Sequence, residues 1–126
     1  MSTYKTNQSG FPIHLVVEVA SPAPARSYVE IDGVEIIKSP DFSGGSILET
    51  PIGSNAKLQG KTLKITTIID LSPLTDDEKA LALNMIKTEY TLNGGPDGMQ
   101  RFWLLKTKWI QIGDDIFINK YIDLIP

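Results

Sequence analysis

Short runs of apolar residues recur along this chain, and glycine-rich turns separate them. The last third, residues 86–124, contains two such turns, at 93–98 and at Gly113-Asp114. Glycine readily adopts the positive φ that tight hairpin turns require. The pattern predicts a three-stranded antiparallel meander, and the rest of the interpretation depends on it.

The register of this predicted meander follows from its turns. A four-residue loop at 94–97 places Tyr90 opposite Arg101, and a two-residue turn places Trp109 opposite Ile118. Side chains alternate between the two faces of a sheet, and both hairpins send the same residues to the same face. We expect that face to be core, and its members are Ile86, Tyr90, Leu92, Met99, Trp103, Leu105, Trp109, Ile118, Ile122 and Leu124.

The opposite face of the meander mixes charged residues with Phe102, Leu104 and Tyr121. A contiguous exposed apolar patch usually marks a partner surface or a second covering layer. Two alternatives stay open for these three residues. Either a segment of the same chain covers them, or they form an interface.

Strands are also predicted in the first half of the chain. Residues 11–19 alternate, with Ile13, Leu15 and Val17 on one face, and residues 62–70 form a β-branched run typical of a central strand. The Asp32-Gly33 dipeptide predicts a hairpin. Its register places Glu30 opposite Glu35. The residues expected on its buried face are Val29, Ile31, Val34 and Ile36.

One helix is expected, at about residues 75–85. Thr75 and Glu78 have the spacing of a capping box, in which each side chain bonds the other residue's backbone amide. The segment 38–60 is rich in Ser, Gly, Pro and Asn, and 46–50 is its best candidate for an edge strand.

These elements predict an all-β fold, mainly antiparallel. We expect a β-sandwich or small barrel with one short helix around 75–85, in a single domain that spans residues 1–126. An α+β two-layer arrangement is the alternative.

Composition narrows the classes of function. Hydrophobic residues make up 41% of the chain, the net charge is −3, and basic and acidic residues are interspersed. The basic patch of a nucleic-acid-binding protein is missing, and no run approaches the roughly 18 apolar residues of a membrane helix. The polar start is unlike a secretory signal, and the lack of cysteine excludes disulfides and thiolate metal sites. We expect a cytoplasmic protein, and export by a route without a cleavable signal stays open.

Candidate chemistry is sparse. His14, the one histidine, shares a predicted strand face with Glu18, yet no nucleophile motif accompanies it, which favours a surface histidine. Glu30, Asp32 and Glu35 could offer oxygens to a divalent cation, but exposed carboxylates can also splay apart in water. We therefore predict no catalytic residue, no metal site and no cofactor.

Aromatic residues suggest where a ligand could bind. Trp103 and Trp109 are predicted to be core. If the fold is a barrel with an open mouth, Tyr90 and Arg101 are the residues expected to line it.

The function that these patterns favour is a non-enzymatic structural or protein-interaction module, which assembles with itself or with a larger protein complex. The alternative is a β domain that binds a small carbohydrate or lipid-like ligand, with residues 38–60 as a lid. A small hydrolase built around His14 is the third hypothesis. The expected partner is a protein or a second copy of the chain, with neither nucleic acid nor membrane.

Overall fold

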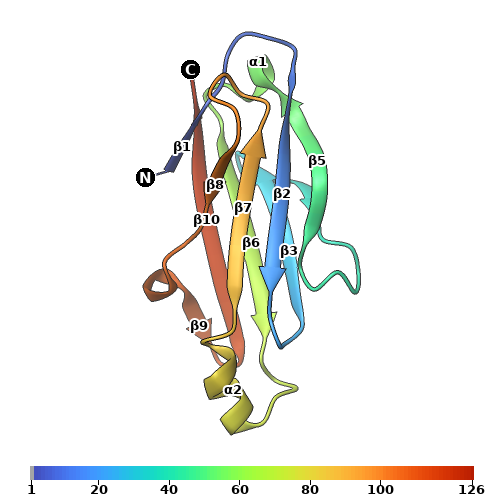
Figure 1. The fold of residues 1–126 in the computed structure, drawn as a ribbon, viewed down its shortest axis with the longest axis vertical. Coiled ribbons are helices and arrows are strands. Elements are labelled where there is room, and N and C mark those ends of the chain that lie inside the picture. The colour runs from blue at the N-terminus through green and yellow to red at the C-terminus, as the bar shows by residue number, and fades with distance from the viewer. Residues whose placement is uncertain (1) are drawn as a thin grey trace.

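Two β-sheets pack face to face in the computed structural model, which describes residues 2–126 (Figure 1). The strands are β1 (Ser2–Lys5), β2 (Pro12–Ala20), β3 (Ala25–Ile31), β4 (Val34–Lys38), β5 (Ile47–Ser54), β6 (Thr62–Asp70), β7 (Lys87–Asn93), β8 (Gln100–Phe102), β9 (Ile110–Ile112) and β10 (Asp115–Ile125). The larger sheet has the order β1-β10-β6-β3-β4, with β9 also paired to β10, and the smaller has the order β5-β2-β7-β8. All pairs except β1–β10 are antiparallel. The predicted all-β, sandwich-like fold is confirmed.

The strand predicted as central, residues 62–70, is confirmed, and the strand predicted at 11–19 is also present. β6 lies between β10 and β3 and alternates strictly, with Leu63, Ile65 and Ile69 fully buried. In the smaller sheet β2 buries Ile13 and Leu15 in the same way. Side chains from both sheets therefore interdigitate in one layer, as expected for a sandwich.

The predicted helix and its cap are also present. In α2 (Asp76–Ala82), Thr75 N donates to Glu78 Oε1 at 2.9 Å, and Glu78 N donates to Thr75 Oγ1 at 3.2 Å. The segment 38–60 contains β5, which overlaps the edge strand predicted at 46–50, and the short helix α1 (Asn55–Leu58). These two helices lie at opposite ends of the molecule (Figure 1). Within residues 2–126 no helix combines the length and the apolar character that crossing a membrane would take.

The β3–β4 hairpin is confirmed in position and corrected in detail. Asp32 and Gly33 both have positive φ (47° and 82°), as a two-residue hairpin turn requires, and Glu30 stands opposite Glu35. The expectation that Val34 and Ile36 would be buried is wrong, because both are exposed. A bulge next to Glu30 places Ile37, rather than Ile36, opposite Val29, and β4 is the edge strand of its sheet.

The N-terminal strand β1 was not predicted, because its four residues are mostly polar. It pairs in parallel with β10, from Ser2 opposite Ile122 to Lys5 opposite Ile125. Its Tyr4 is 2% exposed and lies beneath the turn that joins β7 to β8. The Tyr4 hydroxyl donates to Gly98 O at 2.6 Å and accepts from Gly95 N at 2.9 Å. Burial raises the pKa of this hydroxyl above its usual range, so it keeps its proton.

The continuous meander predicted for residues 86–124 is wrong. Tyr90 pairs with Phe102, not with Arg101, so the β7–β8 register differs by one residue from the prediction. After Phe102 the chain leaves the smaller sheet and enters the larger one as β9. The second turn is confirmed, because Ile112 pairs with Asp115 across Gly113-Asp114.

A one-residue change of register exchanges the two faces of a strand. Phe102, predicted for the outer face, is therefore buried against the edge of the Tyr4 ring, with 6.5 Å between ring centroids. Met99, Trp103 and Leu105 are exposed, contrary to the prediction, and Trp109 is only partly buried. The members of the predicted core face that are buried are Ile86, Tyr90, Leu92, Ile118, Ile122 and Leu124.

The core has two apolar clusters, one on each side of a buried hydroxyl chain. Ser27 Oγ lies 2.9 Å from Thr67 Oγ1, which lies 3.0 Å from the Tyr90 hydroxyl. The cluster around Leu15 and Ile65 extends toward α1, and the cluster around Ile69 and Ile116 extends toward α2. Each hydroxyl in the chain has a partner, which removes the cost of burying it.

Replacing Tyr4 with Phe removes both bonds to the β7–β8 turn. We expect Tyr4→Phe to lower the free energy of unfolding by about 1–3 kcal/mol, because Gly95 N and Gly98 O lose their partner. Urea unfolding followed by circular dichroism measures this change. Tyr28→Phe is the matched control, since no hydrogen bond of the Tyr28 hydroxyl is found within residues 2–126. Equal stabilities of the two variants would contradict the clamping role of Tyr4.

Candidate functional site

The segment that crosses from β8 to β9 spans residues 103–109, and we name it the strap. It contains one 3-10 turn, η1 (Lys106–Lys108), and it lies over the edge of the sandwich where β7 faces β10 (Figure 1). Leu104 and Trp109 pack against the core cluster around Ile69 and Ile116, whereas Trp103 and Leu105 are exposed. The strap is thus anchored by two side chains and presents two others to solvent.

Departure of the strap leaves two stretches of strand edge without a partner. β8 pairs only with residues 90–92 of β7, so residues 87–89 have no strand on that side. On β10, β9 pairs with 115–117 and β1 pairs with 122–125, which leaves 118–121 open between them. Unpaired strand edges offer backbone donors and acceptors to another chain.

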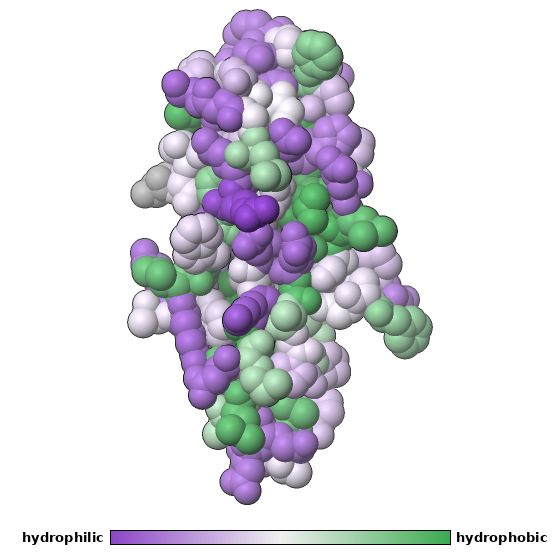
Figure 2. Space-filling view, in the orientation of Figure 1, coloured by the Kyte–Doolittle hydropathy of each residue, from purple (hydrophilic) through white to green (hydrophobic). Residues whose placement is uncertain are grey.

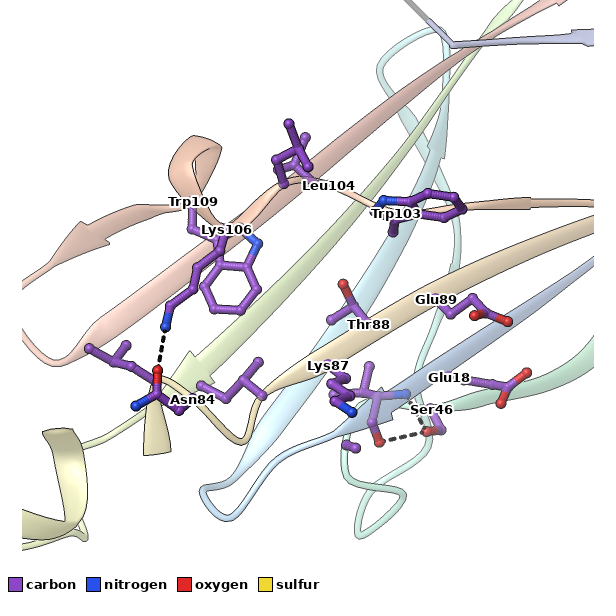
Figure 3. A pocket seen from close by; sticks show the side chains of 15 residues that line it. Glu18, Ser46, Asn84, Lys87, Thr88, Glu89, Trp103, Leu104, Lys106 and Trp109 are labelled. Atoms are coloured by element: carbon purple, nitrogen blue, oxygen red, sulfur yellow. Dashed lines mark hydrogen bonds between the residues drawn. The ribbon is translucent and has the colours of Figure 1, made fainter. Parts of the chain in front are cut away.

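The first groove, the β7 groove, has a volume of about 820 Å³ and lies between the strap and β7 (Figure 3). Thr88 points from β7 toward the strap, and Lys106 Nζ donates to Asn84 Oδ1 at 3.0 Å across the groove. The indole Nε1 of Trp109 is buried and has no hydrogen-bond partner among residues 2–126. At the other end Glu18 and Glu89 stand opposite each other, and Arg101 Nε lies 3.5 Å from Glu89 Oε1.

The second groove, the β10 groove, has a volume of about 790 Å³ and lies on the other side of the strap. Lys108 and Lys120 line it together with Ile110 and Tyr121. Within residues 2–126 neither lysine has a carboxylate within ion-pair distance. Partial burial lowers the pKa of Lys120, and the nearby charge of Lys108 lowers it further.

Large apolar side chains surround the β10 groove. Trp103 and Leu105 are each 59% exposed, Ile110 is 53% exposed, and Tyr121 is 48% exposed. Lys64 Nζ lies 5.5 Å from the centroid of the Tyr121 ring, within reach of a cation–π contact. Figure 2 shows apolar and strongly polar side chains next to each other along the left margin, where Figure 1 draws the strap. Aromatic and basic groups thus meet on one surface.

The predicted ligand pair Tyr90 and Arg101 is not brought together. Tyr90 is fully buried, its hydroxyl lies 3.0 Å from Thr67 Oγ1, and burial raises its pKa. Arg101 stands opposite Thr91, the neighbour of Tyr90, so the two side chains project to opposite faces of the smaller sheet.

The three residues expected at an interface lie in different environments. Phe102 is in the core, so it is covered by the chain itself. Leu104 is partly buried and lines both grooves beneath the strap, and Tyr121 is exposed beside the β10 groove. Only Tyr121 therefore offers the large exposed surface that the prediction had assigned to all three.

The remaining candidate groups stand apart from the strap. His14 Nδ1 lies 4.0 Å from Glu49 Oε1 on β5, rather than near Glu18. Asp32 Oδ1 accepts from Thr62 N at 2.8 Å, which is a structural contact next to the opposed Glu30 and Glu35. Among residues 2–126 no group of three or more His, Cys, Asp and Glu side chains could hold a metal ion.

Lys120 was not singled out as a functional residue from the sequence, although the alternation of apolar residues around it was a signal. Ile116, Ile118, Ile122 and Leu124 recur at every second position of β10 and are buried. Lys120 occupies the one polar position in that series, so strand alternation directs it toward the interior. A charged residue that interrupts a core-facing series marks a special position.

No family model matches this chain, and no curated protein or solved structure matches it either.

Removing the charge at Lys120 should stabilise the fold. We expect Lys120→Met to raise the melting temperature by about 1–4 °C, because it removes a partly desolvated ammonium that is repelled by Lys108. Thermal unfolding at neutral pH measures the change. Lys5→Met, at an exposed position of β1, is the control and should shift the unfolding free energy by less than about 0.5 kcal/mol. A melting temperature lower than that of the wild type would show that Lys120 has a structural role.

Proposed function

We propose that this protein is a non-enzymatic interaction module, which assembles with itself or with a larger protein complex through the strap and its two flanking grooves. The observation that carries the proposal is the group of exposed apolar residues Trp103, Leu105, Ile110 and Tyr121. Tryptophan and tyrosine are the residues that most often dominate the energy of protein interfaces. Exposing them together costs solubility, and a partner would remove that cost.

The contrast between strand edges supports the same surface. β5, at one edge of the smaller sheet, carries Pro51 and two irregularities in its pairing with β2. β4, at one edge of the larger sheet, carries a bulge and the charged residues Glu35 and Lys38. Such features discourage pairing with another chain. The open edges of β7 and β10 beside the strap lie next to apolar side chains instead, which favours addition of a partner segment there.

The proposal also covers the kind of partner and the location of this protein in the cell. Net charge −3 with interspersed basic residues supports a protein partner rather than a nucleic acid. The proposed location is the cytoplasm, which agrees with a chain that has no cysteine to form a disulfide.

One observation favours the second candidate function, the binding of a small carbohydrate or lipid-like ligand. Trp109 Nε1 is a buried donor without a partner in residues 2–126, and it borders the β7 groove. A ligand acceptor atom in that groove would satisfy it. In a Trp103→Phe variant Trp109 is the remaining tryptophan, so its fluorescence against glycans and fatty acids tests this alternative.

Photo-crosslinking tests the interaction module directly. With a benzophenone side chain at position 103, we expect one discrete protein adduct in the cells that make this protein, either with a second copy or with a partner. The adduct should disappear when Leu105→Ser and Ile110→Ser are added, because these changes remove the flanking apolar surface.

Position 48 supplies the matched control. Leu48 is also exposed but lies on β5, at the opposite edge of the smaller sheet from β8. Equal labelling from positions 48 and 103, or no adduct from position 103, would refute the proposal.

A further inference from the structure

Lys120 points into the open edge of the sandwich from a position that β10 otherwise gives to core residues. Its strand neighbours on that face, Ile118 and Ile122, are fully buried. Across the sheet Lys120 stands opposite Ile65, which is also fully buried. The Lys120 side chain therefore leaves β10 on the core side, and it lines the β10 groove.

A second positive charge lies next to the first. Lys108, in η1 of the strap, lines the same groove, and its charge adds to partial burial in lowering the pKa of Lys120. Both lysines lack an acidic partner within residues 2–126. Two like charges held together in a partly desolvated groove are the arrangement that an anionic ligand would relieve.

The backbone of β10 adds a second feature at the same place. Residues 118–121 have no strand partner on the groove side, whereas β9 and β1 continue the pairing on either end. The gap of four residues corresponds to about 13 Å of extended chain. A short extended segment could pair with this edge by backbone hydrogen bonds, the mode known as β-strand addition.

We propose that the β10 groove binds an acidic, extended peptide segment of a partner protein, whose carboxylates lie between Lys108 and Lys120. This inference rests on the proposed function and specifies the chemistry of the partner. An acidic residue opposite Lys120 faces inward, and an apolar residue opposite Tyr121 faces outward, because side chains alternate along both strands. The segment recognised therefore has an acidic residue opposite Lys120 and an apolar residue next to it, opposite Tyr121.

Other polyanions and a second copy fit this groove less well. A nucleic acid would meet a chain of net charge −3, and the open edge of β10 pairs with peptide backbone rather than with phosphate. In this chain Val34-Glu35-Ile36 of the edge strand β4 also places an acidic residue between apolar ones, but a bulge interrupts the pairing of β4, which disfavours its addition to another sheet.

A defined peptide tests the inference. The probe is a fluorescein-labelled, end-capped peptide of about six residues with alternating Val and Glu, matched in length to the open edge. We expect it to bind the full chain with a Kd of about 10–100 μM by fluorescence anisotropy, and the affinity should fall as salt rises. The same peptide with Gln in place of Glu should bind at least about tenfold more weakly.

Protein variants locate the site. Lys108→Ser combined with Lys120→Met should weaken binding of the Glu peptide at least about tenfold. Lys5→Met combined with Lys57→Met removes the same total charge elsewhere and should leave binding unchanged. In the wild type, backbone amide signals of residues 118–121 should shift on titration with the peptide in nuclear magnetic resonance spectra, which provides a readout that needs no variant.

Several results would overturn the inference. These are equal binding of the Glu and Gln peptides, unchanged binding by the Lys108/Lys120 variant, or no binding of the Glu peptide up to about 1 mM. Tighter binding of a single-stranded oligonucleotide would identify a nucleic acid as the occupant. A dimer in sedimentation that the Lys108/Lys120 variant abolishes would identify a second copy. Crosslinking from position 103 decides the proposed function separately, since that test depends on the apolar residues of the strap.

Discussion

The contact between Tyr4 and the β7–β8 turn determines much of what lies at the edge of the sandwich. The Tyr4 hydroxyl holds Gly95 N and Gly98 O, and a Cβ atom at Gly95 would come within 2.8 Å of the Tyr4 ring. The turn therefore fits closely over a side chain from the other end of the sequence. With the turn held in this form, Tyr90 pairs with Phe102, and Phe102 rather than Trp103 enters the core.

The path of the strap follows from that register. Because Phe102 is the last residue of β8, the chain crosses to the larger sheet while β7 and β10 still have open edges. Leu104 and Trp109 hold the strap against the core cluster near α2, and Trp103 and Leu105 are left in solvent. The same crossing separates the β7 groove from the β10 groove, so one segment shapes both candidate binding surfaces.

Stability and interaction make opposite demands at this edge. A pairing of β7 and β10 along their full length with neighbouring strands would satisfy more backbone groups, and an apolar residue at position 120 would extend the core. The chain instead places an unpaired lysine and half-exposed aromatic residues there. Elsewhere its edges carry a proline, a bulge and charged residues. Local departures from the most stable arrangement are typical of surfaces that bind.

Local patterns in the sequence determined the strands β2, β3 and β6, the Asp32-Gly33 and Gly113-Asp114 turns, and the capping box of α2. Alternation, turn residues and side-chain caps act over a few neighbouring positions, so they can be seen without a structure. The tertiary structure decided the rest. Tyr4 contacts a turn about ninety residues away, and this long-range contact decided the register of β8, the exposure of Trp103 and the open groove around Lys120, which no local pattern specifies.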